Sequence, residues 1–255
     1  MRPLALLQKL RPLGLRPTAR EAVLLRRRSA GLRFAALALA LLSATPARAF
    51  WLLGFSTAAT QTPGTAGFIG GTGGQLTVVQ DKASFTPYLA HAGLRLGILD
   101  DLDVGYRLCT VALPYNAGGP VLGGQLDVKL RLTALTSRWA FAVGASGANA
   151  FLQFAGATST AWSPGAYAIL SHPLSRRIDW ALDARYVRSY VEPSGNAPAG
   201  LLDAVGGSAG LKIDLLPHVA VRPELGLFDF MGTIHGEAAN GWGLQYGAVL
   251  SAQAW

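Results

Sequence analysis

Residues 122–134 read LGGQLDVKLRLTA and alternate between two kinds of side chain with a period of two. Even positions carry only Leu, Val, Gly and Ala, whereas odd positions carry Gly, Gln, Thr and the charged residues Asp127, Lys129 and Arg131. Successive side chains of a β-strand point to opposite faces, so this stretch predicts a strand with one apolar face and one charged face. A soluble sandwich shows the same alternation, and this strand alone does not identify the solvent.

The same pattern recurs along the chain. Comparable alternation is found at 90–98, 102–108, 139–146, 178–186, 205–214, 219–227 and 244–251. Residues 66–80 and 85–98 are expected to pair through a connection at 80–84. Together with the connections between them, these segments predict ten antiparallel strands, each supplying the roughly 9 to 11 residues that a membrane-spanning strand needs.

Short and long connections alternate between the predicted strands. Short turns are expected at 99–101, 135–138, 172–177 and 216–217, and longer Gly-, Pro- and Asn-rich loops at 114–120, 155–161, 192–200 and 229–240. Transmembrane barrels sort their connections in this way, with short turns in the periplasm and longer loops outside, and closure leaves no unpaired strand edge in lipid. We therefore predict an all-β fold, a single up-and-down transmembrane barrel of about ten strands, with eight or twelve as alternatives.

The first 49 residues have the composition of an export signal. They carry ten of the 22 basic residues but one of the 14 acidic residues, so the remainder has 12 basic and 13 acidic residues and gives no support for a nucleic-acid partner. Arg26, Arg27, Arg28 and Arg33 precede a short apolar run at 34–42. Ala47 and Ala49 flank Arg48 as in a signal-peptidase site. We expect export by the Sec route and cleavage before Phe50; a membrane anchor is the alternative, although the apolar run is about half the roughly 20 residues that a spanning helix needs.

The expected organisation is therefore a signal peptide at 1–49, a lead-in segment at 50–64 and a barrel at 65–255. The lead-in could instead add two strands and raise the count to twelve. Cys109 is the only cysteine, so an intramolecular disulfide and a multi-cysteine metal site are excluded. The glycine run at 70–74 lacks the Gly-Lys-Ser/Thr ending of a phosphate-binding loop and is expected to be a bend in a strand. We predict no metal and no cofactor.

Residues 92–108, AGLRLGILDDLDVGYRL, resemble the strand, acidic turn and strand hairpin of small bacterial outer-membrane β-barrel proteins. The resemblance covers nearly all of 64–255 and identifies no narrower subfamily. It implies a location in the bacterial outer membrane, with lipid, lipopolysaccharide and the barrel-assembly machinery as partners. The terminal Trp255 is similar to the aromatic signal that this machinery reads, although it is out of phase with Tyr246 and Leu250.

Two groups of side chains are expected to occupy defined places in such a barrel. Aromatic girdles at the membrane interfaces are predicted to include Trp139, Trp180, Tyr186, Tyr190 and Trp242. Charged residues on the inner face destabilise the barrel less than they would in lipid, where each basic residue near the midplane lowers the folding stability by about 2 to 4 kcal/mol. The predicted lumen-lining charges are Arg95, Asp103, Arg107, Asp127, Lys129, Arg131, Asp179, Asp183, Arg185, Lys212, Asp214, Arg222 and Glu224.

Three functions are compatible with these residues, because a fold does not specify its function. The favoured one is a non-enzymatic barrel with a lumen filled by paired charges and a structural or surface-interaction role. The second is a porin-like channel for a small polar solute. The third is an outer-membrane hydrolase, with His235, Asp229 and Glu237 in the last long loop or the inward His91 as candidates. The remaining histidines, His172 and His218, stand singly, and no hydrolase motif is present.

Overall fold

The computed structural model describes residues 53–79, 82–111, 121–154, 157–193, 198–234 and 236–254, which all belong to one compact unit. The predicted signal peptide with its cleavage site at Ala47 and Ala49, the loop at 114–120, His235 and Trp255 lie outside these residues. Among the described residues, no helix is long and apolar enough to cross a bilayer.

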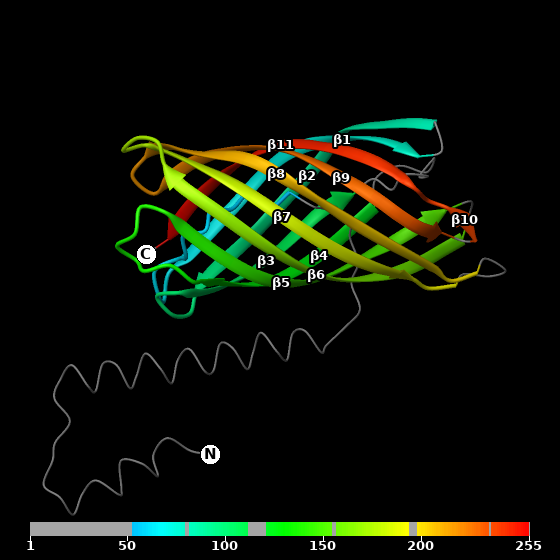
Figure 1. Ribbon diagram of the computed structural model, residues 1–255, viewed down its shortest axis with the longest axis horizontal. Helices are drawn as coiled ribbons and strands as arrows, with labels where there is room; N and C mark the ends of the chain where they lie inside the picture. The colour runs from blue at the N-terminus through cyan, green and yellow to red at the C-terminus, as the bar shows by residue number, and fades with distance from the viewer. Residues whose placement is uncertain are drawn as a thin grey trace, which may run out of the picture. The chain divides into compact units, whose positions relative to one another are not determined.

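Ten long antiparallel strands close into a barrel (Figure 1), as the sequence predicts. They are β1 (Ala66–Val79), β2 (Lys82–Gly97), β3 (Leu102–Val111), β4 (Val121–Arg131), β5 (Ala140–Phe154), β6 (Ala157–Pro173), β7 (Ile178–Val191), β8 (Gly200–Leu216), β9 (Val219–Ile234) and β11 (Gly241–Ala254). Each strand pairs with its neighbours along the chain, and β1 closes the barrel against β11 from Ala66↔Ala254 to Val79↔Gly241. The two-residue strand β10 (Glu237–Ala238) pairs only with the end of β9 and is not part of the barrel wall. The barrel therefore has ten strands, and neither alternative of eight or twelve is correct.

The period of two sorts the side chains to the two sides of the barrel wall. On β7, Asp183, Arg185 and Ser189 are buried, whereas Leu182, Ala184, Tyr186 and Tyr190 are exposed. On β4, Lys129 is 1% exposed whereas Leu130 is 38% exposed. The apolar face therefore points outward and the charged face lines an enclosed interior.

Two of the predicted long loops are partly strand. Residues 157–161 belong to β6, and the pairs Phe151↔Thr160 to Phe154↔Ala157 continue the ladder of β5 and β6 nearly to its tip. Similarly, β9 runs to Ile234. The Gly-, Ser- and Thr-rich composition indicated loops, but Thr also suits a half-exposed ladder.

The connections are consequently less sorted by length than predicted. One end of the barrel, the turn end, carries the connections at 98–101, 132–139, 174–177 and 217–218. The opposite loop end has longer ones at 112–120 and 192–199 but only two residues between β1 and β2 and between β5 and β6. Because the longest connection, at 112–120, lies at the loop end, we take the turn end as periplasmic.

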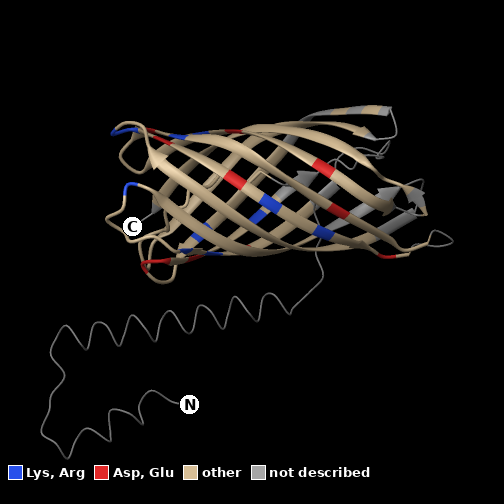
Figure 2. Cartoon of the chain, in the orientation of Figure 1, with Lys and Arg blue, Asp and Glu red and all other residues tan. Residues whose placement is uncertain are grey.

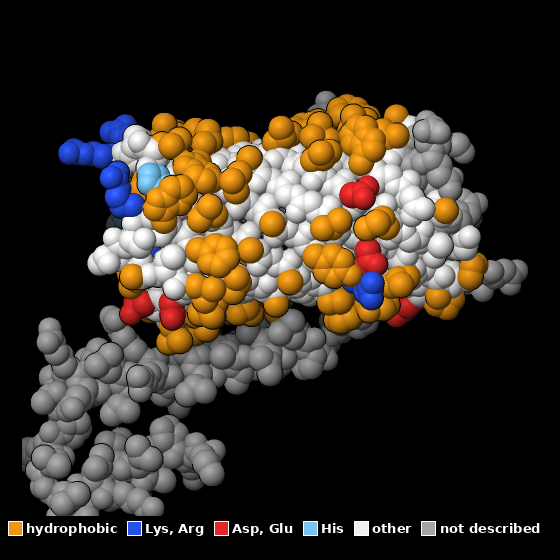
Figure 3. Space-filling view, in the orientation of Figure 1, with side chains coloured by type: hydrophobic (Ala, Val, Ile, Leu, Met, Phe, Trp, Pro, Cys, Tyr) orange, Lys and Arg blue, Asp and Glu red, His pale blue; other side chains and the backbone are white. Residues whose placement is uncertain are grey.

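Large apolar side chains form a belt on the outside of the barrel (Figure 3). Trp139 and Trp180 meet edge to face near the turn end, with ring centroids 5.8 Å apart. Trp162 and Tyr190 stack near the loop end at 5.9 Å. Tyr190 follows Trp180 by ten positions on β7. At about 3.3 Å per residue and the usual strand tilt, the two girdles are therefore roughly 25 Å apart along the barrel axis, which is the height of the apolar band of an outer-membrane barrel. The other predicted girdle residues, Tyr186 and Trp242, are also exposed on the outer face.

A charge placed in the middle of this belt tests whether it faces lipid. Ala184 is exposed on β7 between Trp180 and Tyr190. We expect Ala184→Lys to lower the free energy of unfolding by about 2 to 4 kcal/mol, because a lysine near the midplane of a bilayer is poorly solvated. Urea titration in phospholipid vesicles, followed by tryptophan fluorescence, measures this loss. The control Leu174→Lys in an exposed turn should change the same quantity by less than about 1 kcal/mol, and equal small effects of the two substitutions would contradict a lipid-facing wall.

Candidate functional site

Figure 2 shows where the charged residues lie along the strands, and the burial of their side chains places most of the predicted charges in the interior of the barrel. Eight of them lie in its middle part, on β2, β3, β4, β7 and β9: Arg95, Asp103, Arg107, Asp127, Lys129, Asp183, Arg185 and Glu224. The other five, Arg131, Asp179, Lys212, Asp214 and Arg222, are partly exposed and lie closer to the turn end. Lys212 pairs there with Asp214 at 2.8 Å and Asp179 at 3.7 Å, and Arg131 donates to the Ala134 carbonyl oxygen at 2.8 Å.

The charges in the middle part are joined across strands. The Arg95 guanidinium pairs with Asp103 and with Asp127, the latter at 2.5 Å, and Lys129 Nζ lies 3.3 Å from Asp103 Oδ2. The Tyr167 hydroxyl donates to Asp127 at 2.6 Å. A buried charge costs free energy unless it is paired and hydrogen-bonded. These ion pairs and the hydrogen bond from Tyr167 provide part of the partners that the buried charges need.

On the opposite wall, Arg185 pairs with Asp183 at 2.9 Å and lies 4.7 Å from the centroid of the Tyr167 ring. The Tyr167 ring in turn covers Gly144 of the neighbouring strand, where an added Cβ would lie 2.2 Å from Tyr167 Cζ. A tyrosine over a glycine fills space that the glycine leaves, so the two clusters of charge are connected through a packed aromatic ring.

The sequence does not predict the most consequential feature of the interior. Residues 53–61, which we call the plug, run inside the barrel from its middle toward the turn end, where the chain turns and enters β1. The plug side chains Leu53, Phe55 and Ala58 are at most 2% exposed. These residues belong to the segment interpreted as a lead-in or as extra strands. They add no strand to the barrel wall, and the twelve-strand alternative is wrong.

Cationic side chains of the barrel bind alternate carbonyl groups of the plug. Arg107 Nη1 donates to the Leu53 carbonyl oxygen at 2.7 Å, and Arg222 Nη1 donates to that of Phe55 at 3.0 Å. Lys129 Nζ donates to the carbonyl oxygens of residues 57 and 59 at 2.9 and 2.6 Å. The carbonyl groups at positions 53, 55, 57 and 59 are therefore held by three cations from three strands.

Acidic and hydroxyl side chains bind the plug amides. The Glu224 carboxylate accepts the consecutive N–H groups of Gly54 at 3.0 Å and Phe55 at 2.5 Å. Phe55 has a φ of 46°, in the left-handed region that a bulky residue rarely adopts. Successive N–H groups that converge on one carboxylate form an anion-binding nest, and Glu224 is therefore well placed to stabilise this unusual conformation.

Two further plug amides are bound nearer the turn end. Ser171 Oγ accepts the N–H of Ala58, and Asp103 Oδ2 accepts that of Gln61, both at 3.1 Å. Because Asp103 also pairs with Arg95 and Lys129, the plug is part of the same network as the interior ion pairs.

Small residues of the wall make room for the plug side chains. A Cβ added at Gly226 would lie 2.8 Å from Leu53 Cδ2, and one added at Gly247 would lie 2.8 Å from Phe55 Cζ. The Phe55 ring also meets the ring of His91 edge to face at 5.2 Å. Ala58 packs into an apolar cluster on the inner sides of β5, β6 and β7: Ala140, Ala142, Tyr167, Ile169 and Ala181.

The plug is attached to the turn end through its last residues. Thr60 Oγ1 donates to the Asp100 carbonyl oxygen at 2.6 Å, and Gln253 donates to the Gln61 side chain at 2.6 Å. Gly97 lies against the following residues, and a Cβ added there would be 2.2 Å from the Thr62 carbonyl oxygen. The chain then turns at Gly64, whose φ of +80° favours glycine, and enters β1.

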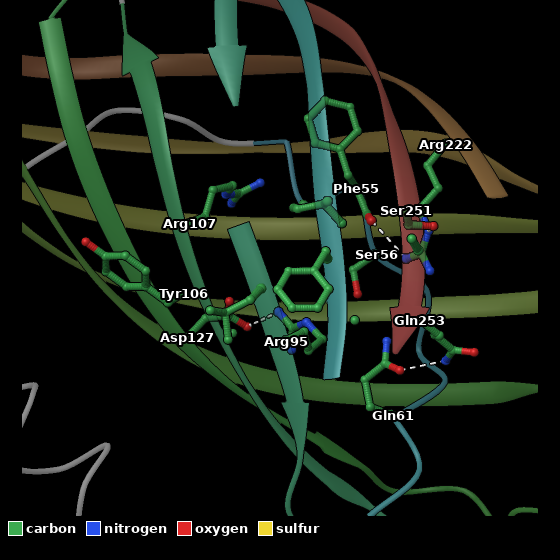
Figure 4. Close-up of a pocket in the computed structure, with 17 residues that line it drawn as sticks. Phe55, Ser56, Gln61, Arg95, Tyr106, Arg107, Asp127, Arg222, Ser251 and Gln253 are labelled. Carbon is green, nitrogen blue, oxygen red and sulfur yellow. Dashed lines mark hydrogen bonds and ion pairs between the residues drawn. The ribbon is translucent and has the colours of Figure 1, made fainter. Parts of the chain in front are cut away.

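Little space is left beside the plug. Figure 4 shows Phe55, Ser56 and Gln61 between Arg95 and Arg107 on one side and Arg222, Ser251 and Gln253 on the other. The remaining cavity there has a volume of about 50 Å³, enough for only a few water molecules. A wider cavity of about 380 Å³ opens at the turn end, lined by residues that include Arg177, Lys212, Asp214, His218 and Arg222.

The hydrolase candidates are not brought together among the described residues. His235 lies outside them, and Asp229 is exposed on β9, where it pairs in register with Trp242. His91 faces the lumen, as predicted, and packs against Phe55. Within the described part of the chain, no three His, Cys, Asp or Glu side chains are grouped as metal ligands.

One outward charged pair is missing from the sequence prediction. Arg188 of β7 makes a bidentate pair with Asp203 of β8, with both N–O distances at 2.8 Å, and the Tyr186 hydroxyl donates to Asp203 at 2.6 Å. Arg188 lies two residues from Tyr190 on the same face. The pair thus lies at the level of the loop-end girdle, where polar groups meet lipid headgroups.

A closed antiparallel barrel with an apolar outer belt and charges in its interior is built to span a bilayer with strands. The chain is an outer-membrane β-barrel protein, located in the bacterial outer membrane.

Neither protein-family models nor curated proteins match the sequence. Among solved structures, the chain is similar to Neisserial surface protein A, with 11% identity over 73% of this chain and 96% of that one and a TM-score of 0.41. It is also similar to the outer membrane protease OmpT of Escherichia coli, with 8% identity over 78% and 100% of the two chains and a TM-score of 0.47. A third is the outer membrane protein OmpT of Vibrio cholerae in its trimer form, with 9% identity over 76% and 100% and a TM-score of 0.24. Such distant likenesses concern the fold alone.

Removing one plug-binding cation tests the network. Lys129→Met removes the donor to Ser56, Thr57 and Ala59, and a single hydrogen bond to a charged group contributes about 1.5 to 3 kcal/mol. We expect the amide hydrogens of Ala58 and Gln61 to exchange about tenfold faster or more in hydrogen–deuterium exchange measured by mass spectrometry. The control Lys212→Met, which removes a cation paired only near the turn end, should leave plug exchange unchanged. Unchanged exchange in a folded Lys129→Met barrel would show that these bonds do not hold the plug.

Proposed function

We propose that this protein is a non-enzymatic outer-membrane barrel whose lumen is closed by the plug and whose role is structural or surface-directed. The observation that carries this proposal is the course of residues 53–61 through the middle of the lumen, bound on both sides by buried charges. A barrel of eight strands is just filled by its own side chains, and ten strands leave additional room. The plug occupies that room and leaves about 50 Å³ beside it.

The engagement of the interior charges supports a non-enzymatic role. Glu224 accepts two plug amides and the Ser208 hydroxyl, and Asp103 accepts a plug amide and pairs with two cations. A general base needs access to a substrate proton, which these enclosed carboxylates lack while the plug is bound.

The outward surface is where we place contacts with other molecules. The Arg188–Asp203 pair and the girdle residues Tyr186 and Tyr190 lie at the loop end, at the level of lipid headgroups. Outer-membrane lipid and lipopolysaccharide are the partners that this surface suits, and assembly by the barrel-assembly machinery is the route that the fold implies. A small polar solute remains the ligand of the alternative, a channel, which requires the plug to leave.

Conductance separates the closed barrel from the channel. In a planar lipid bilayer we expect the unmodified protein to give no stable conductance steps, because the plug leaves no continuous aqueous path. Gly97→Ala should produce discrete steps, since its new Cβ would meet the Thr62 and Gln61 carbonyl oxygens at 2.2 and 2.6 Å and displace the plug without changing a charge.

The matched control is Gly70→Ala on β1, where the nearest atom to an added Cβ is 4.0 Å away and silence is expected. Steady steps from the unmodified protein, with the same amplitude as those of Gly97→Ala, would establish the channel and overturn the proposal.

A further inference from the structure

The contacts of the plug are those of a bound ligand. Its main chain is held by Arg107, Lys129, Ser171, Arg222 and Glu224, which come from the four strands β3, β4, β6 and β9. None of these residues is a sequence neighbour of the plug, and the bonds to Glu224 span 170 and 169 positions. The wall therefore forms a binding site that is independent of how the plug is connected to β1.

We propose that the lumen is a peptide-binding site that binds one segment, in the main-chain conformation of the plug, through its main chain. The plug occupies this site within the same molecule, and a free peptide of matching pattern occupies it when the plug has left. The inference rests on the proposed closed barrel, because it identifies what closes the lumen as an exchangeable ligand.

The chemistry of the site defines the class of peptide. Alternate carbonyl groups must face Arg107, Arg222 and Lys129, and the main chain must bend at the residue in the place of Phe55 so that two consecutive N–H groups reach Glu224. The side chains enter spaces that the wall leaves at Gly226, at Gly247 and beside the apolar cluster. These spaces select a large aliphatic residue at position 53, an aromatic one at 55 and a small one at 58.

An empty lumen would favour such a peptide. Without an occupant, Lys129 would keep Asp103 but lose its three plug acceptors, and Glu224 would lose two amide donors. Buried charges that lack hydrogen-bond partners cost free energy, and a peptide with suitable side chains that adopts the main-chain conformation of the plug would satisfy them again. The cavity at the turn end gives an incoming segment a polar entrance next to Arg222.

The covalent connection explains why the plug itself is the normal occupant. A short flexible linker holds a ligand at an effective concentration on the order of millimolar, so a free peptide competes poorly. The linker is accessible at Gly64, which is exposed and has no atom within 4 Å of an added Cβ. Cutting the chain there removes the advantage of the plug without altering the binding site.

The experiment begins with the full chain carrying a protease recognition sequence inserted at Gly64. The protein is folded, placed in lipid nanodiscs and then cut. A fluorescent peptide with the sequence of residues 53–64, LGFSTAATQTPG, is titrated against the cut and the uncut protein, and binding is followed by fluorescence anisotropy. We expect saturable binding to the cut protein, release of the original fragment, and at least about tenfold weaker binding to the uncut protein.

Peptides with single ester bonds test whether the main chain is read. An ester that replaces the N–H of Phe55 removes the donor to Glu224 and should weaken binding by about tenfold or more. The matched control places the ester at Thr57, whose N–H has no partner recorded among the described residues, and should change affinity less than about threefold. Glu224→Gln in the barrel should reduce the effect of the Phe55 ester, because both changes act on one bond.

The outcomes separate this inference from the proposed function. If the cut protein loses its fragment and conducts but does not bind the peptide, the lumen is no peptide site and the closed barrel still stands. Equal weakening by the two esters would overturn recognition through the main chain. Stable conductance of the uncut protein would overturn the closed barrel itself.

Discussion

The hydrogen bonds between the interior charges and the main chain of residues 53–61 are the interaction on which the rest of the structure depends. Lys129 is 1% exposed and Asp103 is fully buried, in a place where unpaired charge costs several kcal/mol. Ion pairs between strands provide some of the partners that these charges need, but an ammonium has three hydrogen-bond donors and a carboxylate has more than one acceptor site. A peptide main chain supplies acceptors and donors in alternation, and it therefore completes what the paired side chains leave unsatisfied.

On both faces of the barrel wall, each side chain lies where its surroundings can solvate it, and because the surroundings differ, the two faces differ in composition. On the outer face, Leu182, Leu225 and Leu227 are exposed because lipid solvates them. Their inward-facing neighbours Asp183, Glu224 and Gly226 instead contact interior charges or the plug. A bidentate pair on the outer face, Arg188 with Asp203, lies at the level of the loop-end girdle. Polar groups are placed wherever water, headgroups or main chain can bind them.

The alternation with a period of two was enough to predict the strands, their number and the side to which Lys129 and Leu130 point, because that period follows directly from strand geometry. Connection lengths were less predictable, since a polar segment such as 157–161 forms a ladder as readily as a loop. The plug was missed because LGFSTAATQ has no periodicity of its own, and its partners in the barrel lie 40 to 192 positions away. The available signal was indirect: an interior with many predicted charges and a width of ten strands needs an additional occupant. Arg188 was missed because the alternation was followed only to Tyr186.

The position of the plug directly before β1 ties the filling of the barrel to its closure. All neighbouring strands pair as hairpins except β1 and β11, which meet across the whole length of the chain. Such a long-range pairing has a large entropic cost of loop closure and forms slowly. Because β1 follows the plug within five residues, the seam between β1 and β11 is also the one that brings the interior occupant into place. We therefore expect the closing of the open sheet into a sealed cylinder and the neutralisation of its buried charges to occur together.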